Sequence, residues 1–156
     1  MTEARSWTPE TEKHLRKAGW YPGRHMKAEV AEWRALMPDI FMSRAAESAL
    51  LEFGGLRAEP AKASGLECAP SHFHLDPERA DPVAEAELAP HRPFVSGELF
   101  PLGEIDHGHA SLYIDDGGRV YMFFDELEVM GDTIEAALDA LVVGRLSRKL
   151  PRAPSA

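Results

Sequence analysis

The first third of the chain carries apolar residues at helical spacing, and this pattern predicts three helices. The first begins after Thr8, which can cap it, and Gly19 closes it in the left-handed conformation. The second covers roughly residues 27–37 and is stopped by a proline. The third starts after Asp39 and runs to Phe53. Its apolar face is expected to hold Phe41, Ala45, Ala49 and Phe53, widened by Met42, Ala46 and Leu50.

Residues 56–96 are divided by six prolines into short pieces. Short strands are expected at 55–59 and 72–75, where apolar residues lie between turn residues. A short helix is expected from Asp81, as its cap, through Ala89. This part of the chain therefore predicts short elements joined by turns.

The last third is rich in strands up to residue 124 and ends in one further helix. Asp132 and Glu135 are expected to cap this helix as a pair, and Gly144 weakens its far end. Its apolar face is expected to hold Ile134, Leu138, Leu141, Val142 and Leu146. The order of helices, strands and a helix predicts an α+β fold, with a central, mostly antiparallel sheet flanked by the N-terminal helices and one C-terminal helix. A single domain is expected over residues 1–150, followed by a disordered tail at 151–156.

The sequence DDGG between two apolar runs predicts a hairpin turn at 115–118. A three-residue loop with Gly117 in the left-handed conformation pairs Ile114 with Gly118 and Leu112 with Val120. Its core face is then Ala110, Leu112, Ile114, Val120, Met122 and Phe124. The opposite face, which is expected to be solvated, covered by a helix or used as a contact surface, holds His109, Ser111, Tyr113, Arg119, Tyr121 and Phe123.

Composition narrows the functional classes. The 156 residues include 26 acidic and 17 basic side chains, a net charge of -9, which argues against binding to nucleic acids and to anionic membranes. Cys68 is the only cysteine, so an intrachain disulfide and a thiolate metal cluster are excluded. No apolar run is long enough for a bilayer span, and the N-terminus lacks an apolar signal-peptide core. A cytoplasmic protein is expected.

Four residues suggest a metal site as an alternative. His72, His74 and Glu78, followed by His107, resemble the two metal-binding motifs of the cupin family, which bind a divalent metal through histidine and glutamate. The glycine spacing departs from the cupin pattern, and the N-terminal third is helical where a cupin is mostly β. No metal or cofactor is therefore expected, and a small cupin-like metalloenzyme is kept as the alternative hypothesis.

Six motifs in order resemble the SUKH superfamily of bacterial immunity proteins, most closely its third group. They are LRKAGWYPGR at 15–24, LLEFGGL at 50–56, HFHLDPERA at 72–80, GELFPLGE at 97–104, LYIDDGGRVY at 112–121 and IEAALDALVVG at 134–144. The resemblance covers nearly the whole chain. It implies an α+β fold and a cytoplasmic, non-enzymatic protein that binds and neutralises a polymorphic toxin, commonly a nuclease or a nucleic-acid deaminase. A SUKH-like adaptor with a host partner is a third possibility.

The excess of acidic over basic side chains agrees with such a partner, because a nuclease or deaminase presents a basic substrate groove. Candidate toxin contacts are the polar residues of the strand-rich part, with two tyrosines as possible aromatic anchors. The polar candidates are Glu104, Asp106, His107, Asp115, Asp116, Asp125, Glu126 and Glu128, and the anchors are Tyr113 and Tyr121.

Overall fold

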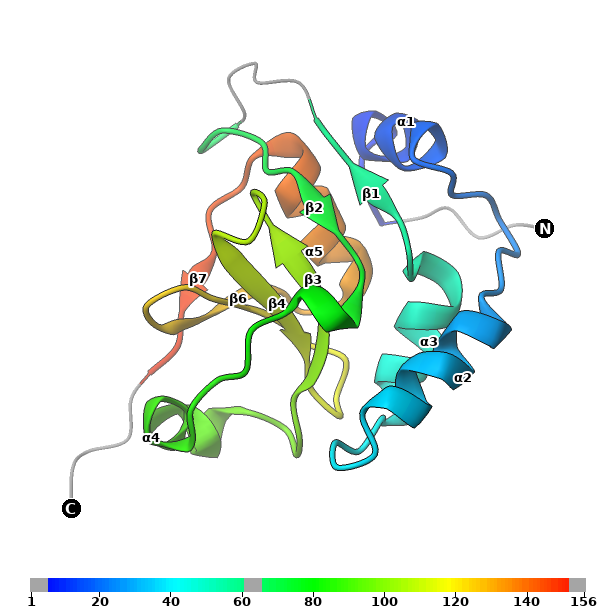
Figure 1. Cartoon of the computed structure of the whole chain (residues 1–156). Coiled ribbons are helices and arrows are strands. Elements are labelled where there is room, and N and C mark those ends of the chain that lie inside the picture. The colour runs from blue at the N-terminus through cyan, green and yellow to red at the C-terminus, as the bar shows by residue number, and fades with distance from the viewer. Residues whose placement is uncertain (1–5, 61–65, 152–156) are drawn as a thin grey trace.

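A seven-stranded antiparallel sheet organises the computed structural model, which describes residues 6–60 and 66–151 (Figure 1). The strands lie in the sheet in chain order, each paired with the next, which confirms the predicted α+β class. They are β1 Arg57–Ala58, β2 Phe73–His74, β3 Phe100–Ile105, β4 Ala110–Ile114, β5 Val120–Phe123, β6 Leu127–Gly131 and β7 Arg148–Lys149. The helices are α1 Pro9–Lys17, α2 Lys27–Leu36, α3 Arg44–Phe53, α4 Glu85–Leu88 and α5 Ile134–Val143, with 3₁₀ turns η1 Pro77–Arg79 and η2 Ala89–Phe94.

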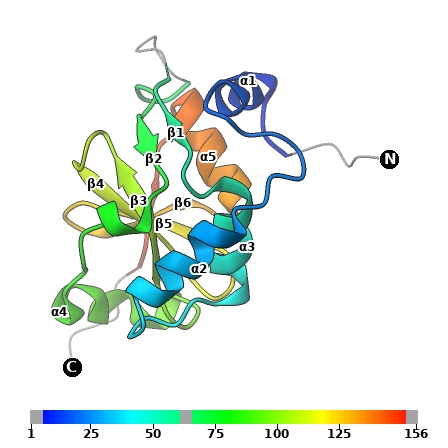
Figure 2. The ribbon, with the colours of Figure 1, turned by 45° about the vertical axis from the view of Figure 1, so that its right-hand side comes forward.

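The helices divide between the two faces of the sheet. Helices α1, α2, α3 and α5 lie together on one side, and α4 lies apart from them (Figures 1 and 2). The main core lies between the first group and the sheet, and includes Leu15, Phe53, Leu112 and Leu138. A smaller apolar cluster on the other face joins Leu88, Val95, Tyr121, Leu127 and Val129. Both faces of the central strands are therefore covered.

The predicted ends of α1 are confirmed. The Thr8 side chain accepts a hydrogen bond from the backbone N–H of Thr11, at 3.3 Å. Gly19 has a φ of 114°, and the backbone N–H of Trp20 donates to the carbonyl of Leu15 at 2.9 Å. Local sequence chemistry was sufficient to place this helix.

Other helix ends differ from the prediction. Helix α3 starts at Arg44, because Ser43 caps it by accepting from the N–H of Ala46, so Phe41 lies in the preceding turn and is 66% exposed. Thr133, not the pair of Asp132 and Glu135, caps α5. Gly144, at a φ of 73°, ends α5, so Leu146 lies beyond the helix and is exposed.

Further differences concern short elements. The predicted strands near 55–59 and 72–75 are two residues each, and the helix expected from Asp81 is confined to α4 and continues into η2. Strands β6 and β7 were not predicted. Of the predicted tail at 151–156, only Pro151 lies within the described residues.

The β4–β5 hairpin has a five-residue loop. Ile114 pairs with Val120 and Leu112 with Met122, and Gly118, not Gly117, has the positive φ, at 92°. The predicted register was wrong by two residues, but a shift of two keeps every side chain on its predicted face. The predicted core face is buried up to Val120, whereas Phe124, past the end of β5, is half exposed.

Candidate functional site

The predicted contact residues lie at two opposite ends of the sheet. Because Ile105 pairs with Ala110 and Ser111 with Phe123, the β3–β4 turn and the β5–β6 turn share one end. The rings of His109 and Phe124 stack there, with centroids 4.4 Å apart. Asp106, His107, Asp125 and Glu126 belong to this end, and Asp115 and Asp116 belong to the other. The ten residues therefore do not form one patch.

Asp115 and Tyr121 are buried inside the fold. One carboxylate oxygen of Asp115 accepts hydrogen bonds from the backbone N–H groups of Gly117 and Arg119, both at 3.0 Å. The other accepts from the N–H of Ser96 at 3.1 Å and from the hydroxyl of Tyr121 at 2.7 Å. Burial first, and then the hydrogen bond to this carboxylate, raise the pKa of Tyr121. This network sets the five-residue loop and takes both side chains out of reach of a partner.

Two half-buried predicted contacts are already engaged with neighbours. Glu104 forms an ion pair with Arg79, at 3.4 Å between the two side chains. Glu128 accepts a hydrogen bond from the hydroxyl of Ser147 at 3.1 Å. Their carboxylates are thus partly used within the chain.

His72 and His107 form a pair across the β2 and β3–β4 segments. The ring nitrogens Nδ1 of His72 and Nε2 of His107 lie 3.1 Å apart, and the backbone N–H of His72 donates to Asp106 at 3.0 Å. Burial, followed by the positive charge of Arg79, lowers the pKa of the His74 imidazole. Glu78 is exposed in η1. Across residues 6–60 and 66–151, no three His, Cys, Asp or Glu side chains are placed to hold a metal, so the four cupin-like residues do not come together as the alternative hypothesis requires.

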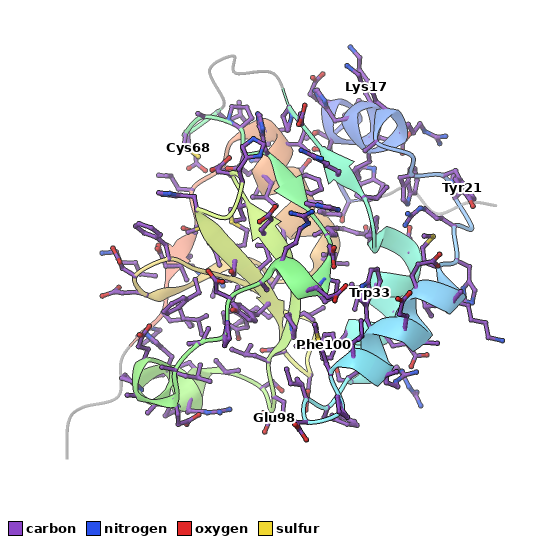
Figure 3. All side chains as sticks on the ribbon, in the orientation of Figure 1. Lys17, Tyr21, Trp33, Cys68, Glu98 and Phe100 are labelled. Atoms are coloured by element: carbon purple, nitrogen blue, oxygen red, sulfur yellow. The ribbon has the colours of Figure 1, made fainter. Side chains whose placement is uncertain are left out.

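A groove lies on the sheet face opposite the main core. The groove has a volume of about 360 Å³, and it is bounded by the turn between α2 and α3, the segment from η1 to η2, and the start of β3. Figure 3 shows Glu98 at the lower edge of the molecule, between α4 and the α2–α3 turn. We call it the acidic groove; its lining includes Met37, Asp39, Ile40, Glu78, Asp81, Val83, Glu85, Arg92, Glu98, Leu99, Pro101 and Tyr113.

The charges of the acidic groove are unbalanced. Five carboxylates and one guanidinium, that of Arg92, line it. Arg92 is bound to Glu85 by two hydrogen bonds of 2.9 and 3.3 Å, and these two side chains neutralise each other. Within the described ranges no ion pair reaches the other four carboxylates, those of Asp39, Glu78, Asp81 and Glu98. The groove therefore presents a surplus of negative charge above an apolar floor.

Tyr113 forms part of that floor and is 5% exposed. Its hydroxyl is buried and has no hydrogen-bond partner in the part of the chain that the structure describes. The neighbouring Ser111 hydroxyl already accepts from the backbone N–H of Asp81, at 2.9 Å. Burial raises the pKa of Tyr113 to about 12, so the phenol stays protonated at neutral pH. A buried hydroxyl without a partner costs roughly 1–3 kcal/mol.

Comparison with known protein families gives one match. The family model described as SUKH-3 immunity protein matches residues 7–144. The chain belongs to the SUKH-3 immunity protein family. The match begins just before α1 and ends at the glycine that closes α5, so it includes every element except β7. No curated protein and no solved structure matches the chain.

Membership in the SUKH-3 immunity protein family implies a non-enzymatic protein that neutralises a toxin by binding it. This agrees with the resemblance seen in the six motifs. In the described residues, no helix is both long and apolar enough to cross a bilayer.

The acidic groove lies within the matched SUKH-3 span but was missed from the sequence, except for Tyr113. Two signals point to it in retrospect. Residues 76–87, DPERADPVAEAE, place acidic residues among prolines, and residues 37–41, MPDIF, place large apolar residues in a turn. The two segments lie far apart in the chain and line one groove only in the folded protein, so neither signal was sufficient alone.

Proposed function

We propose that this SUKH-3 protein binds a cognate toxin that acts on nucleic acid, a nuclease or a deaminase, and neutralises it by covering the toxin's basic substrate groove. The observation that carries this proposal is the acidic surplus, 26 acidic against 17 basic side chains, in a family of immunity proteins. An enzyme that binds a phosphate backbone presents lysine and arginine side chains. An acidic protein is steered toward such a groove and competes there with nucleic acid.

The proposed complex forms in the cytoplasm, where the toxin's substrate is present. In this proposal the chain itself binds neither a membrane nor nucleic acid. Of the predicted contacts, Asp106, His107, Asp116 and Asp125 are exposed, and Glu104, Glu126 and Glu128 are half-buried, so burial excludes none of these seven. Tyr113, Asp115 and Tyr121 are buried, and they are not proposed as pre-exposed contacts.

The experiment is co-expression with the toxin encoded by the adjacent gene. We expect this chain to restore growth, to co-purify with the toxin, and to inhibit its cleavage or deamination of nucleic acid in vitro at a stoichiometric ratio. A nuclease toxin from an unrelated locus is the control, and its activity should be unaffected. The proposal is wrong if the adjacent toxin is neither bound nor inhibited.

A further inference from the structure

We propose that the acidic groove is the surface that binds the toxin, and that its occupant is a toxin segment in which arginine or lysine side chains adjoin apolar ones. This inference rests on the proposed function and adds to it a specific site and the chemistry of the partner segment. The groove lies over β3 and β4, away from most of the contacts predicted from the sequence.

Charge is the first argument. The carboxylates of Asp39, Glu78, Asp81 and Glu98 line one groove and form no ion pair within the described residues. By contrast, Asp106 at the end of the sheet already accepts the backbone N–H of His72, and Glu104 is paired with Arg79. Like charges that gather without a counter-ion repel one another, and a cationic partner relieves that repulsion. The acidic groove therefore favours a basic segment over a neutral or acidic one.

Exposed apolar side chains are the second argument. On the turn between α2 and α3, Ile40 lines the groove and Phe41 follows it, 66% exposed. Leu36, at the end of α2, is 53% exposed. Folding gains little from such exposed side chains, whereas large apolar residues such as Ile40 at a concave surface are typical of protein interfaces. The occupant therefore carries apolar side chains beside its cations.

The Tyr113 hydroxyl is the third argument. Tyr113 lies on β4 and lines the groove, and its hydroxyl is at the end of the side chain, away from the strand backbone. It is the buried polar side-chain atom that the described residues leave without a partner. A toxin group that displaces part of segment 80–88, which contains only the four-residue α4, would reach this hydroxyl and supply the missing hydrogen bond.

The test uses a catalytically inactive variant of the toxin encoded by the adjacent gene as the probe. Asp81→Lys and Glu98→Lys, made singly in the full chain, are expected to weaken its binding by about tenfold or more, because each places a cation against the toxin's cations. Glu32→Lys is the matched control: Glu32 lies on α2, is exposed and does not line the groove. It makes the same change in net charge, and we expect a much smaller effect. Titration calorimetry measures all four proteins.

Three further variants separate loss of contact from loss of folding. Phe41→Ala, next in the chain to the lining residue Ile40, is expected to weaken toxin binding by about tenfold. Leu146→Ala, at an equally exposed apolar residue that neither lines the groove nor adjoins a lining residue in the chain, is expected to leave it unchanged. Tyr113→Phe removes an unpaired hydroxyl, so its Tm is expected to stay the same or to rise. Its toxin affinity is expected to fall by about threefold to tenfold, which a purely structural role for Tyr113 would not produce.

The outcomes distinguish the two proposals. If the wild-type chain fails to bind the toxin, the proposed function is wrong and the site assignment falls with it. If the wild-type chain binds but Asp81→Lys and Glu98→Lys bind as tightly as Glu32→Lys, the assignment of the acidic groove as the binding site is wrong and the proposed function stands. If the chain alone forms a dimer in sedimentation, and Asp81→Lys dissociates it, the occupant is a second copy and not the toxin.

Discussion

At the scale of single residues, two buried aspartates link distant parts of the chain. Asp139 on α5 accepts hydrogen bonds from the backbone N–H and hydroxyl of Thr8, both at 2.9 Å, and from the hydroxyl of Thr11 at 2.6 Å. It thereby joins α5 to the cap of α1. Asp115 performs the equivalent task for the β4–β5 loop. Both residues look in the sequence like ordinary surface acids, and only their surroundings give them a structural role.

Asp139→Asn tests this role. Burial tends to raise the pKa of Asp139, but the hydrogen bonds from Thr11 and Thr8 outweigh it, and the net effect lowers the pKa. A lowered folded-state pKa means that the stabilisation is complete above the ordinary carboxyl pKa and is lost as the pH falls through the folded value. We expect the variant to lose about 1–3 kcal/mol at neutral pH and to depend less on pH in the acid range. Urea unfolding across the pH range measures both effects.

Asp39→Asn is the control for that prediction, because Asp39 is exposed and forms no ion pair among the described residues. Its free energy of unfolding is expected to stay within about 0.5 kcal/mol of the wild type. A parallel loss of stability in the wild type and Asp139→Asn as the pH falls would contradict the assigned role of Asp139.

At the scale of elements, helix boundaries follow the residues that satisfy free backbone groups. Ser43 and Thr133 cap α3 and α5 with their hydroxyls, each accepting from the N–H three residues on. The sequence offers acidic alternatives nearby, Asp39 and Asp132, and local pattern does not decide between them. The consequence at α3 is functional in our proposal, because the later start leaves Phe41 exposed in the turn.

Gly144→Ala distinguishes the two interpretations of this glycine by the sign of its effect. As the left-handed residue that ends α5, at a φ of 73°, its replacement is expected to destabilise the protein by about 1 kcal/mol. Inside a helix the same substitution would stabilise by about the same amount. Ala31→Gly, in the exposed middle of α2, provides the reference cost of an interior helical glycine. Chemical denaturation measures both variants, and a more stable Gly144→Ala would contradict the observed helix end.

At the scale of the whole molecule, the fold brings the α2–α3 turn against a later stretch of the chain that runs from η1 to the start of β3. The α2–α3 turn, the segment from η1 to η2 and the start of β3 meet above β4 and enclose the acidic groove. Composition predicted an acidic protein with a basic partner, but not where the unpaired carboxylates gather. Ion pairs within the chain, such as those of Arg79 and Arg92, decide which acids remain available.

Binding to a basic toxin is expected to depend strongly on salt. Raising the NaCl concentration from about 50 mM to about 500 mM should lower the association rate constant by roughly tenfold, because salt screens the steering field of the two proteins. The dissociation rate constant should change less, since contacts at short range are screened weakly. Surface plasmon resonance with the inactive toxin measures both rate constants. An association rate that salt leaves unchanged would contradict electrostatic steering.

Local patterns in the chain were enough to establish the α+β class, the three N-terminal helices, the ends of α1 and the alternation of faces in the hairpin. These features depend on neighbours within a few residues: a cap, a glycine, or the two-residue period of a strand. The tertiary structure decided that the second face of the sheet is covered, that Asp115 and Tyr121 are internal, and that the acidic groove exists. Those properties depend on which distant segments pack together, because burial and pairing of a charge are set by contacts across the fold and not by the residue type.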